Sequence, residues 1–165
     1  MNQGLWPLLI TVHAVSASFA LLFGAYQLLR KKKGDRKHRV IGYIWVFSMY
    51  AVVITSFWIR TLNGGFTWLH ALSILTFITI TIGLVAAIQG NIKSHKAFMQ
   101  GSYYGVLGAF IGVIAVPTRR IPQMALFDLP TLIAWISAIV LVALTILGVV
   151  NLPFFASKTK SRSEK

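Results

Sequence analysis

The sequence predicts an all-α integral membrane protein with five transmembrane helices, four of them in a bundle built from a tandem two-helix repeat. Three observations predict this fold: the hydrophobic content, the length of the apolar stretches and the spacing of the histidines. Of the 165 residues, 56% are hydrophobic and only 12% are charged, about half the charged share of soluble domains. Such a composition excludes a disordered chain and favours a membrane protein over a soluble one.

The residues that are missing exclude further classes of chemistry. The chain has no cysteine and only 3 acidic residues. Disulfides, thiolate metal sites, iron–sulfur clusters and cysteine nucleophiles are therefore excluded. Little is left for catalysis by paired carboxylates.

Five stretches without Asp, Glu, Lys or Arg are long enough to cross a bilayer, which takes about 20 apolar residues. The expected spans are Leu5–Leu29, Val40–Trp58, Phe66–Ala87, Phe98–Val116 and Leu129–Phe155. We interpret residues 1–155 as one transmembrane domain and residues 156–165 as a polar cytoplasmic tail. The segment between the last two spans is expected to be a short outer loop, in which Asp128 caps the fifth helix at about 129–155.

The basic residues predict how the chain is oriented. Seven Lys or Arg lie between the first two spans, two follow the third span and four lie in the tail, whereas the opposite side has Arg60, Arg119 and Arg120. The positive-inside rule then places the N-terminus outside and the C-terminus inside. We expect the protein to lie in the cell membrane, as a multi-pass protein of the bacterial cytoplasmic membrane. The basic run is expected to be a topology signal, with a lipid head-group site as the alternative. Nucleic acid is not an expected partner, because no base-reading module is present.

The four histidines reveal an internal repeat. The interval from His13 to His38 is equal to the interval from His70 to His95. The first members of the two pairs begin the similar stretches HAVS and HALS. This pattern predicts repeat units over about 5–60 and 61–117, parallel to each other in the membrane. Each unit has a candidate helix cap shortly before its second histidine, at Asp35 and Asn91.

The repeat predicts that equivalent histidines lie at equal depth, with His13 level with His70 and His38 level with His95. In a bundle, each pair can face across the interior. Ionisable residues within a membrane are usually functional, and two opposed neutral imidazoles suit the axial positions of haem b, bound at one level or at both. Zinc suits the pairs less well, because it takes three or four protein ligands. The alternative is that each histidine only bonds between helices.

Haem carries two propionates, which need cationic partners. The candidates are Arg60, Arg119 and Arg120 at the outer end and Arg39 and Lys96 at the inner end. The alternative is that these residues only flank the spans.

Two motifs carry a resemblance to a known family. The stretches HRVIG from His38 and HKAFMQGSY from His95 resemble a family of small bacterial multi-pass membrane proteins of unknown function, whose hallmarks are H-R-x-x-G-R-x-Y and H-R-x-W-M-x-x-S-Y. The resemblance covers the first four spans. This chain departs from the family pattern at Tyr43 and Gly101, where Arg is usual, and at Trp45, where Tyr is usual.

A more distant resemblance concerns the arrangement of the histidines. The four-helix pattern is similar to the transmembrane dihaem cytochromes b, in which histidines on alternate helices hold one haem near each membrane face. The matching positions here are His13 with His70 and His38 with His95.

The sequence therefore favours a b-type haem protein for electron transfer in the membrane, a candidate oxidoreductase with a quinone or a small reductant as its partner. The alternatives are a scaffold or assembly factor without catalysis and a small transporter, in which the histidines are structural. Gly108 and Gly112, small residues four positions apart on the fourth span, favour close helix packing inside the bundle or with another subunit in a homo-oligomer.

Overall fold

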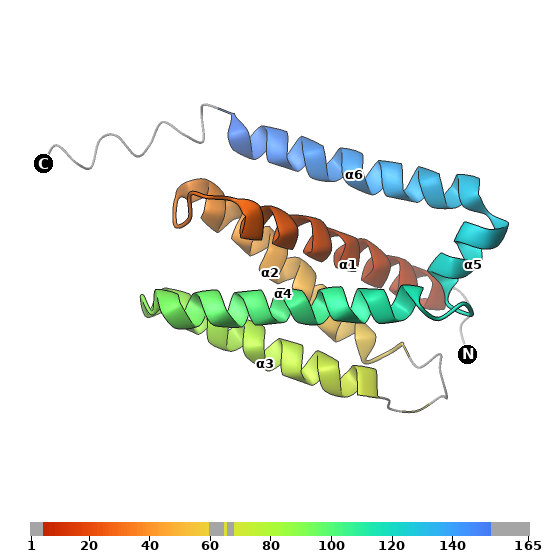
Figure 1. The fold of residues 1–165 in the computed structure, drawn as a ribbon, viewed down its shortest axis with the longest axis horizontal. Helices are drawn as coiled ribbons and strands as arrows, with labels where there is room; N and C mark the ends of the chain where they lie inside the picture. Colours follow the sequence, from red (N-terminus) through yellow and green to blue (C-terminus); the bar gives the residue numbers. More distant parts are fainter. Residues whose placement is uncertain (1–4, 60–64, 66–67, 153–165) are drawn as a thin grey trace, which may run out of the picture.

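The computed structural model describes residues 5–59, 65 and 68–152, and these form helices joined by short connections (Figure 1). No strand occurs in these residues, so the all-α prediction is confirmed. The helices are α1 (Leu5–Leu29), α2 (Arg36–Ser56), α3 (Trp68–Ile88), α4 (Ile92–Ile114), α5 (Arg120–Phe127) and α6 (Leu129–Asn151).

Five of the described helices are long and apolar enough to cross a membrane, namely α1 from Leu8 onward, α2, α3, α4 and α6. The predicted number of spans is confirmed. Which end of the bundle faces the cytoplasm stays a prediction.

The first four spans form a four-helix bundle, as predicted from the repeat. α1 packs along α2 and α3 packs along α4, and the two pairs meet through α1 with α4 and α2 with α3. α1 and α3 therefore occupy one diagonal of the bundle, and α2 and α4 occupy the other. α6 packs outside the bundle against α1 and α2 (Figure 1).

The predicted caps of α2 and α4 are confirmed. The side chain of Asp35 accepts a hydrogen bond from the backbone N–H of His38 at 2.9 Å, and that of Asn91 accepts from Ser94 at 3.1 Å. Because a helix begins at its cap and not at its first apolar residue, both helices start earlier than the spans expected from the sequence. Their first turns consequently carry basic residues.

The two repeat units differ by one residue in register. The step along the chain from His38 to His95 is one residue longer than the step from the cap Asp35 to the cap Asn91. His38 is therefore the third residue of α2, and His95 is the fourth residue of α4. Successive helical residues point about 100° apart, so the two rings leave their helices in different directions relative to the caps.

The outer loop expected before the last span contains a helix, α5, so that expectation was wrong. α5 has only 8 residues and carries Pro122 at its third position, where proline is tolerated because the first-turn N–H groups lack partners within the helix. Asp128 ends α5 and accepts a hydrogen bond from the backbone N–H of Thr131 at 3.4 Å. The predicted cap of the last span is thus confirmed.

Gly24 of α1 is the most closely surrounded of the glycines that the structure describes. A Cβ atom there would lie 2.3 Å from Cδ2 of Tyr103 and 2.7 Å from Nε1 of Trp45. Trp45 and Tyr103 are both buried, and Nε1 of Trp45 donates to the carbonyl of Ala20 at 2.9 Å. The absent side chain therefore lets α1, α2 and α4 converge in the core.

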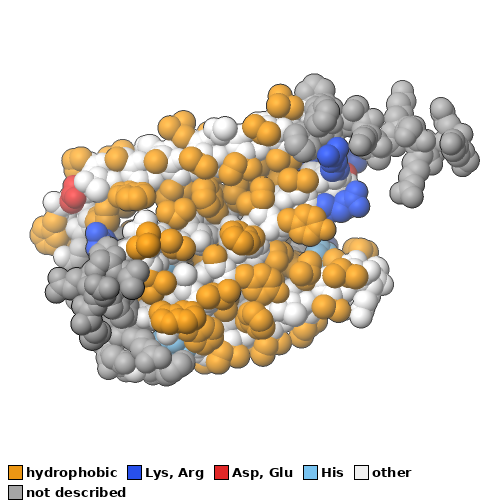
Figure 2. Space-filling view, turned by 180° about the vertical axis from the view of Figure 1, so that it is seen from behind, with side chains coloured by type: hydrophobic (Ala, Val, Ile, Leu, Met, Phe, Trp, Pro, Cys, Tyr) orange, Lys and Arg blue, Asp and Glu red, His pale blue; other side chains and the backbone are white. Residues whose placement is uncertain are grey.

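The sides of the molecule are apolar, and its cations gather at the ends (Figure 2). Large apolar side chains such as Phe47, Ile111 and Leu141 are more than half exposed, which suits a surface surrounded by lipid. One end carries the α1–α2 connection and the first turns of α2 and α4, and we call it the basic end. The end of α6 lies there too, because Nζ of Lys37 donates to Oδ1 of Asn151 at 2.8 Å.

Candidate functional site

His38 and His95 meet across the bundle at the basic end. They come from α2 and α4, which occupy one diagonal of the bundle. Their ring centroids are 6.3 Å apart, and the ring planes are almost perpendicular at 88°. The repeat predicted that this pair faces across the interior, and the geometry confirms that facing.

Gln27 of α1 fixes the orientation of the His38 ring. Nε2 of Gln27 donates to the backbone carbonyl of His38 at 2.7 Å, so the amide oxygen Oε1 is the atom next to Nδ1 of His38, at 3.1 Å. An amide oxygen only accepts hydrogen bonds, so Nδ1 carries the proton. The neutral ring therefore keeps its lone pair on Nε2.

A backbone carbonyl of α3 fixes the His95 ring in the same way. Nδ1 of His95 lies 2.9 Å from the carbonyl oxygen of Gly83, which can only accept. His95 therefore also carries its proton on Nδ1 and its lone pair on Nε2. Histidines that bind metals show this arrangement, with one ring N–H held by an acceptor and the other nitrogen left to coordinate.

Gly83 is the position that brings α3 and α4 close enough for this bond. A Cβ atom at Gly83 would lie 2.9 Å from Cε of Met99 and 3.1 Å from Cβ of Phe98. A larger residue would require the Met99 side chain to move and the Cβ of Phe98 on α4 to shift. The carbonyl that holds His95 is therefore within reach because residue 83 has no side chain.

His13 and His70 lie at the other end of the bundle, on its other diagonal. Nδ1 of His13 is 2.9 Å from Oγ1 of Thr55. The hydroxyl proton of Thr55 goes to the carbonyl of Ala51 at 2.6 Å, so Nδ1 of His13 is the donor to Thr55. His70 is buried, and its ring centroid lies 6.3 Å from that of Phe57. Both histidines therefore lie beside the same end of α2, at a similar depth.

The connection ahead of His38 is held by charged groups. The guanidinium of Arg30 binds both carboxylate oxygens of Asp35, and this lowers the pKa of Asp35 far below its ordinary value and raises that of Arg30. Nζ of Lys33 donates to the carbonyls of Gln27 and Leu28 at the end of α1. Loss of hydration lowers the pKa of Lys33, as do the charges of Lys96 and Arg30.

The cations expected to serve the propionates lie at both ends. Arg39 and Lys96 are exposed and directly follow His38 and His95 in α2 and α4. At the other end, Arg119 is half-buried ahead of α5 and Arg120 is exposed as its first residue. Arg60 lies outside the described residues.

The donor set at the basic end is the pair of His38 and His95. Over residues 5–59 and 68–152, no three or more His, Cys, Asp or Glu side chains gather where they could hold a metal ion. Two histidines suit the axial positions of a haem iron, whose other ligands come from the porphyrin. A zinc ion would need one or two more protein ligands.

Three residues that position the rings escaped the sequence reasoning. Gln27 and Thr55 are polar residues within apolar helices, and this polarity is a signal that could have found them. Gly83 gave no such signal, because only its backbone carbonyl takes part.

The comparisons with known proteins give the family. A family model with the description "Predicted membrane protein (DUF2306)" matches residues 10–149, which include all four histidines. The chain has no detected match among curated proteins or among solved structures. The family match and the five apolar helices together indicate a multi-pass protein in a lipid bilayer. Since the match covers most of the chain, this protein belongs to the DUF2306 family of membrane proteins.

Proposed function

We propose that this protein binds haem b through His38 and His95 and transfers electrons within the membrane. The observation that carries the proposal is the meeting of these two rings across the bundle, with Nδ1 of each already donated to a neighbouring helix. The ring centroids lie 6.3 Å apart, so the two imidazoles are near enough to each other that both could hold one haem iron.

The chain supplies ligands, orientation and charge, and the haem iron supplies the one-electron chemistry. Gln27 and the Gly83 carbonyl hold the two rings so that each Nε2 can coordinate. Arg39 and Lys96 place positive charge beside the ligands, where it can neutralise propionates. Ile41 and Trp45 are buried one turn or two further into α2 and keep water out of the interior.

His13 and His70 are proposed as the ligands of a second haem at the opposite end. This second site rests on the repeat and on the hydrogen bond that holds His13 to Thr55. Two such centres in one bundle would form a route across the membrane. The electron partner is then a membrane quinone or a small reductant, and the membrane is the bacterial cytoplasmic membrane with the basic end inside.

A structural role for the histidines is the second candidate. Its support is that His13, His38 and His95 each bond to a neighbouring helix. In this role the protein would be a scaffold or an assembly factor and would contain no haem. Replacing a histidine would then change stability without changing colour.

The test is an absorption spectrum of the detergent-purified protein from haem-replete cells, oxidised and reduced with dithionite, with a pyridine haemochrome count. We expect a Soret band with sharp reduced α and β bands. The haem at the basic end should be lost in His38→Ala and in His95→Ala. Gln27→Ala keeps both ligands but removes the anchor of His38, so haem affinity should fall about 10–100-fold. A colourless wild-type protein would overturn the proposal.

A further inference from the structure

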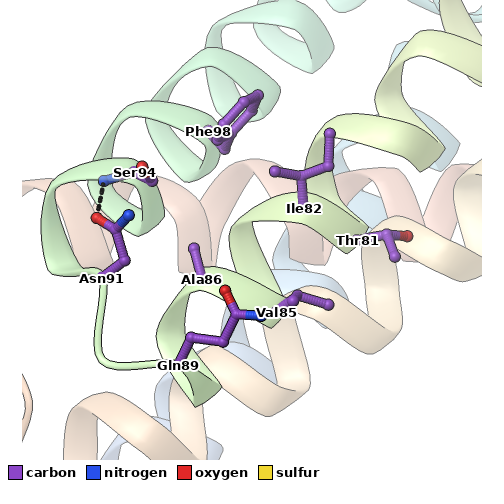
Figure 3. Close-up of a pocket in the computed structure, with 8 residues that line it drawn as sticks. All are labelled: Thr81, Ile82, Val85, Ala86, Gln89, Asn91, Ser94 and Phe98. Carbon is purple, nitrogen blue, oxygen red and sulfur yellow. Dashed lines mark hydrogen bonds between the residues drawn. The ribbon is translucent and has the colours of Figure 1, made fainter.

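A pocket of about 270 Å³ lies on the outer side of the α3–α4 pair at the basic end (Figure 3). Ile82 and Val85 of α3 and Phe98 of α4 form its apolar wall, and both α3 residues are more than 40% exposed. The pocket therefore opens sideways to the surroundings of the helices, where lipid lies, and not into the bundle.

The rim of the pocket toward the basic end is polar but uncharged. It is formed by the amides of Gln89 and Asn91 and the hydroxyl of Ser94 (Figure 3). Oδ1 of Asn91 accepts the backbone N–H of Ser94, which fixes the side chain, and its Nδ2 group can still donate. Neutral donors of this kind suit a carbonyl oxygen. A phosphate group would instead be matched by Lys or Arg, and neither residue lines this pocket.

The residue that holds His95 is a direct neighbour of residues that line this pocket. Ile82 and Phe98 line the pocket, while the neighbouring Gly83 presents its carbonyl to His95. Gly83 has no side chain to separate the helices, so Phe98 packs directly against it. The pocket and His95 therefore both lie on the α3–α4 pair.

We propose that this pocket binds the head group of a membrane quinone. A quinone is an uncharged planar ring with two carbonyl acceptors and an apolar tail, and this pocket combines neutral donors at the membrane boundary with an apolar wall open to lipid. The role of the quinone as an electron partner rests on the proposed function, because it requires haem in the same protein. Binding itself does not require haem.

The test measures binding of a ubiquinone analogue with a ten-carbon tail to the full-length protein in lipid nanodiscs, by isothermal titration calorimetry. Val85→Trp fills the pocket from its exposed side and should abolish saturable binding. Gln89→Ala removes one donor and should weaken binding about three- to tenfold. Ile78→Trp is the matched control, because Ile78 is an equally exposed residue of α3 that does not line the pocket; it should bind like the wild type.

Equal binding by the wild type and Val85→Trp would overturn the inference. Displacement of the quinone by phosphatidylglycerol but not by phosphatidylcholine would also overturn it, since the site would then select an anionic head group. The outcomes separate this inference from the proposed function. Quinone binding that Val85→Trp abolishes, in a protein without haem absorption, would support the quinone site and overturn the haem proposal. Haem absorption in a protein that binds no quinone would support the haem proposal and overturn the quinone site.

Discussion

At the scale of single residues, the two histidines at the basic end are oriented by the same kind of acceptor, supplied from different places in the chain. The side-chain amide oxygen of Gln27 holds His38 and the backbone amide oxygen of Gly83 holds His95. Each keeps the proton on Nδ1, because an amide oxygen only accepts hydrogen bonds. The one-residue difference in register explains why the partners differ, because the two rings leave their helices in different directions. The repeat could therefore predict that the histidines meet, but it could not predict what orients them.

Among the described glycines, Gly24 is the one whose replacement by alanine should overpack the core most. In Gly24→Ala the new methyl group would overlap Tyr103 and Trp45, which are buried and cannot turn away. Overpacking of this kind costs about 1–3 kcal/mol, so the melting temperature followed by circular dichroism in detergent should fall. Gly108→Ala is the control, because a Cβ there meets nothing within 4 Å. Equal shifts in the two variants would contradict the packing argument.

Asp35 should make stability depend on pH. Because Arg30 lowers its pKa below the unfolded value of 3.8, the ionised carboxylate stabilises the fold above about pH 4, and this contribution is lost as pH falls toward the folded pKa. Asp35→Asn keeps a capping side chain, as Asn91 does in α4, but removes the charge. We expect the variant to unfold at a lower temperature than the wild type at pH 7.

The measurement is the difference in melting temperature between wild type and Asp35→Asn from pH 7 to pH 3. The difference should be constant down to about pH 4 and shrink below it. A difference that stays the same over the whole range would show that the cap alone, and not the charge paired with Arg30, stabilises the connection.

At the scale of helices, polar side chains join the spans from within. Tyr50 of α2 bonds Thr81 of α3 at 2.9 Å, and Thr79 of α3 bonds Ser102 of α4 at 2.8 Å. Ser102 is only 3% exposed. Bonds of this kind complement the close packing that holds membrane helices together where no hydrophobic effect drives association.

A double-mutant cycle on Thr79→Val and Ser102→Ala tests this contribution. The coupling free energy in detergent unfolding should be about 0.6 kcal/mol and at most about 1.7 kcal/mol, the range found for such bonds in membranes. The control cycle pairs Thr79→Val with Ser137→Ala, an exposed position of α6, and should show no coupling. Equal coupling in both cycles would mean that the bond contributes nothing specific.

The spans and the caps could be predicted from sequence because both depend on local chemistry. The number of spans followed from apolar length, and Asp35, Asn91 and Asp128 followed from their place ahead of helices. α5 was missed because its 8 residues include a proline and are far too few to cross a bilayer, so a search for long apolar stretches passes over it. The sequence prediction placed the starts of α2 and α4 several residues too late. Hydropathy alone assigns the basic residues of a first helical turn to the preceding loop.

At the scale of the whole molecule, the diagonal arrangement turns a linear repeat into facing pairs. Repeat-equivalent helices lie opposite each other, so equivalent residues that face the interior can meet across it. That explains why equal spacing in the sequence predicted the meeting of His38 and His95. The pocket between α3 and α4 lies outside this relation. It depends on side-chain contacts at one seam, so the spacing of the histidines could not reveal it.

Cysteine labelling can test the orientation in the membrane that the basic residues predict. The chain has no cysteine, so single cysteines can be placed at the exposed positions Lys32 and Thr118, at opposite ends of the bundle. Because the basic end should remain in the cytoplasm, a membrane-impermeant maleimide should label Thr118→Cys in intact cells. It should label Lys32→Cys only after permeabilisation. The reverse labelling pattern would place the basic end, with His38 and His95, on the outer side of the membrane.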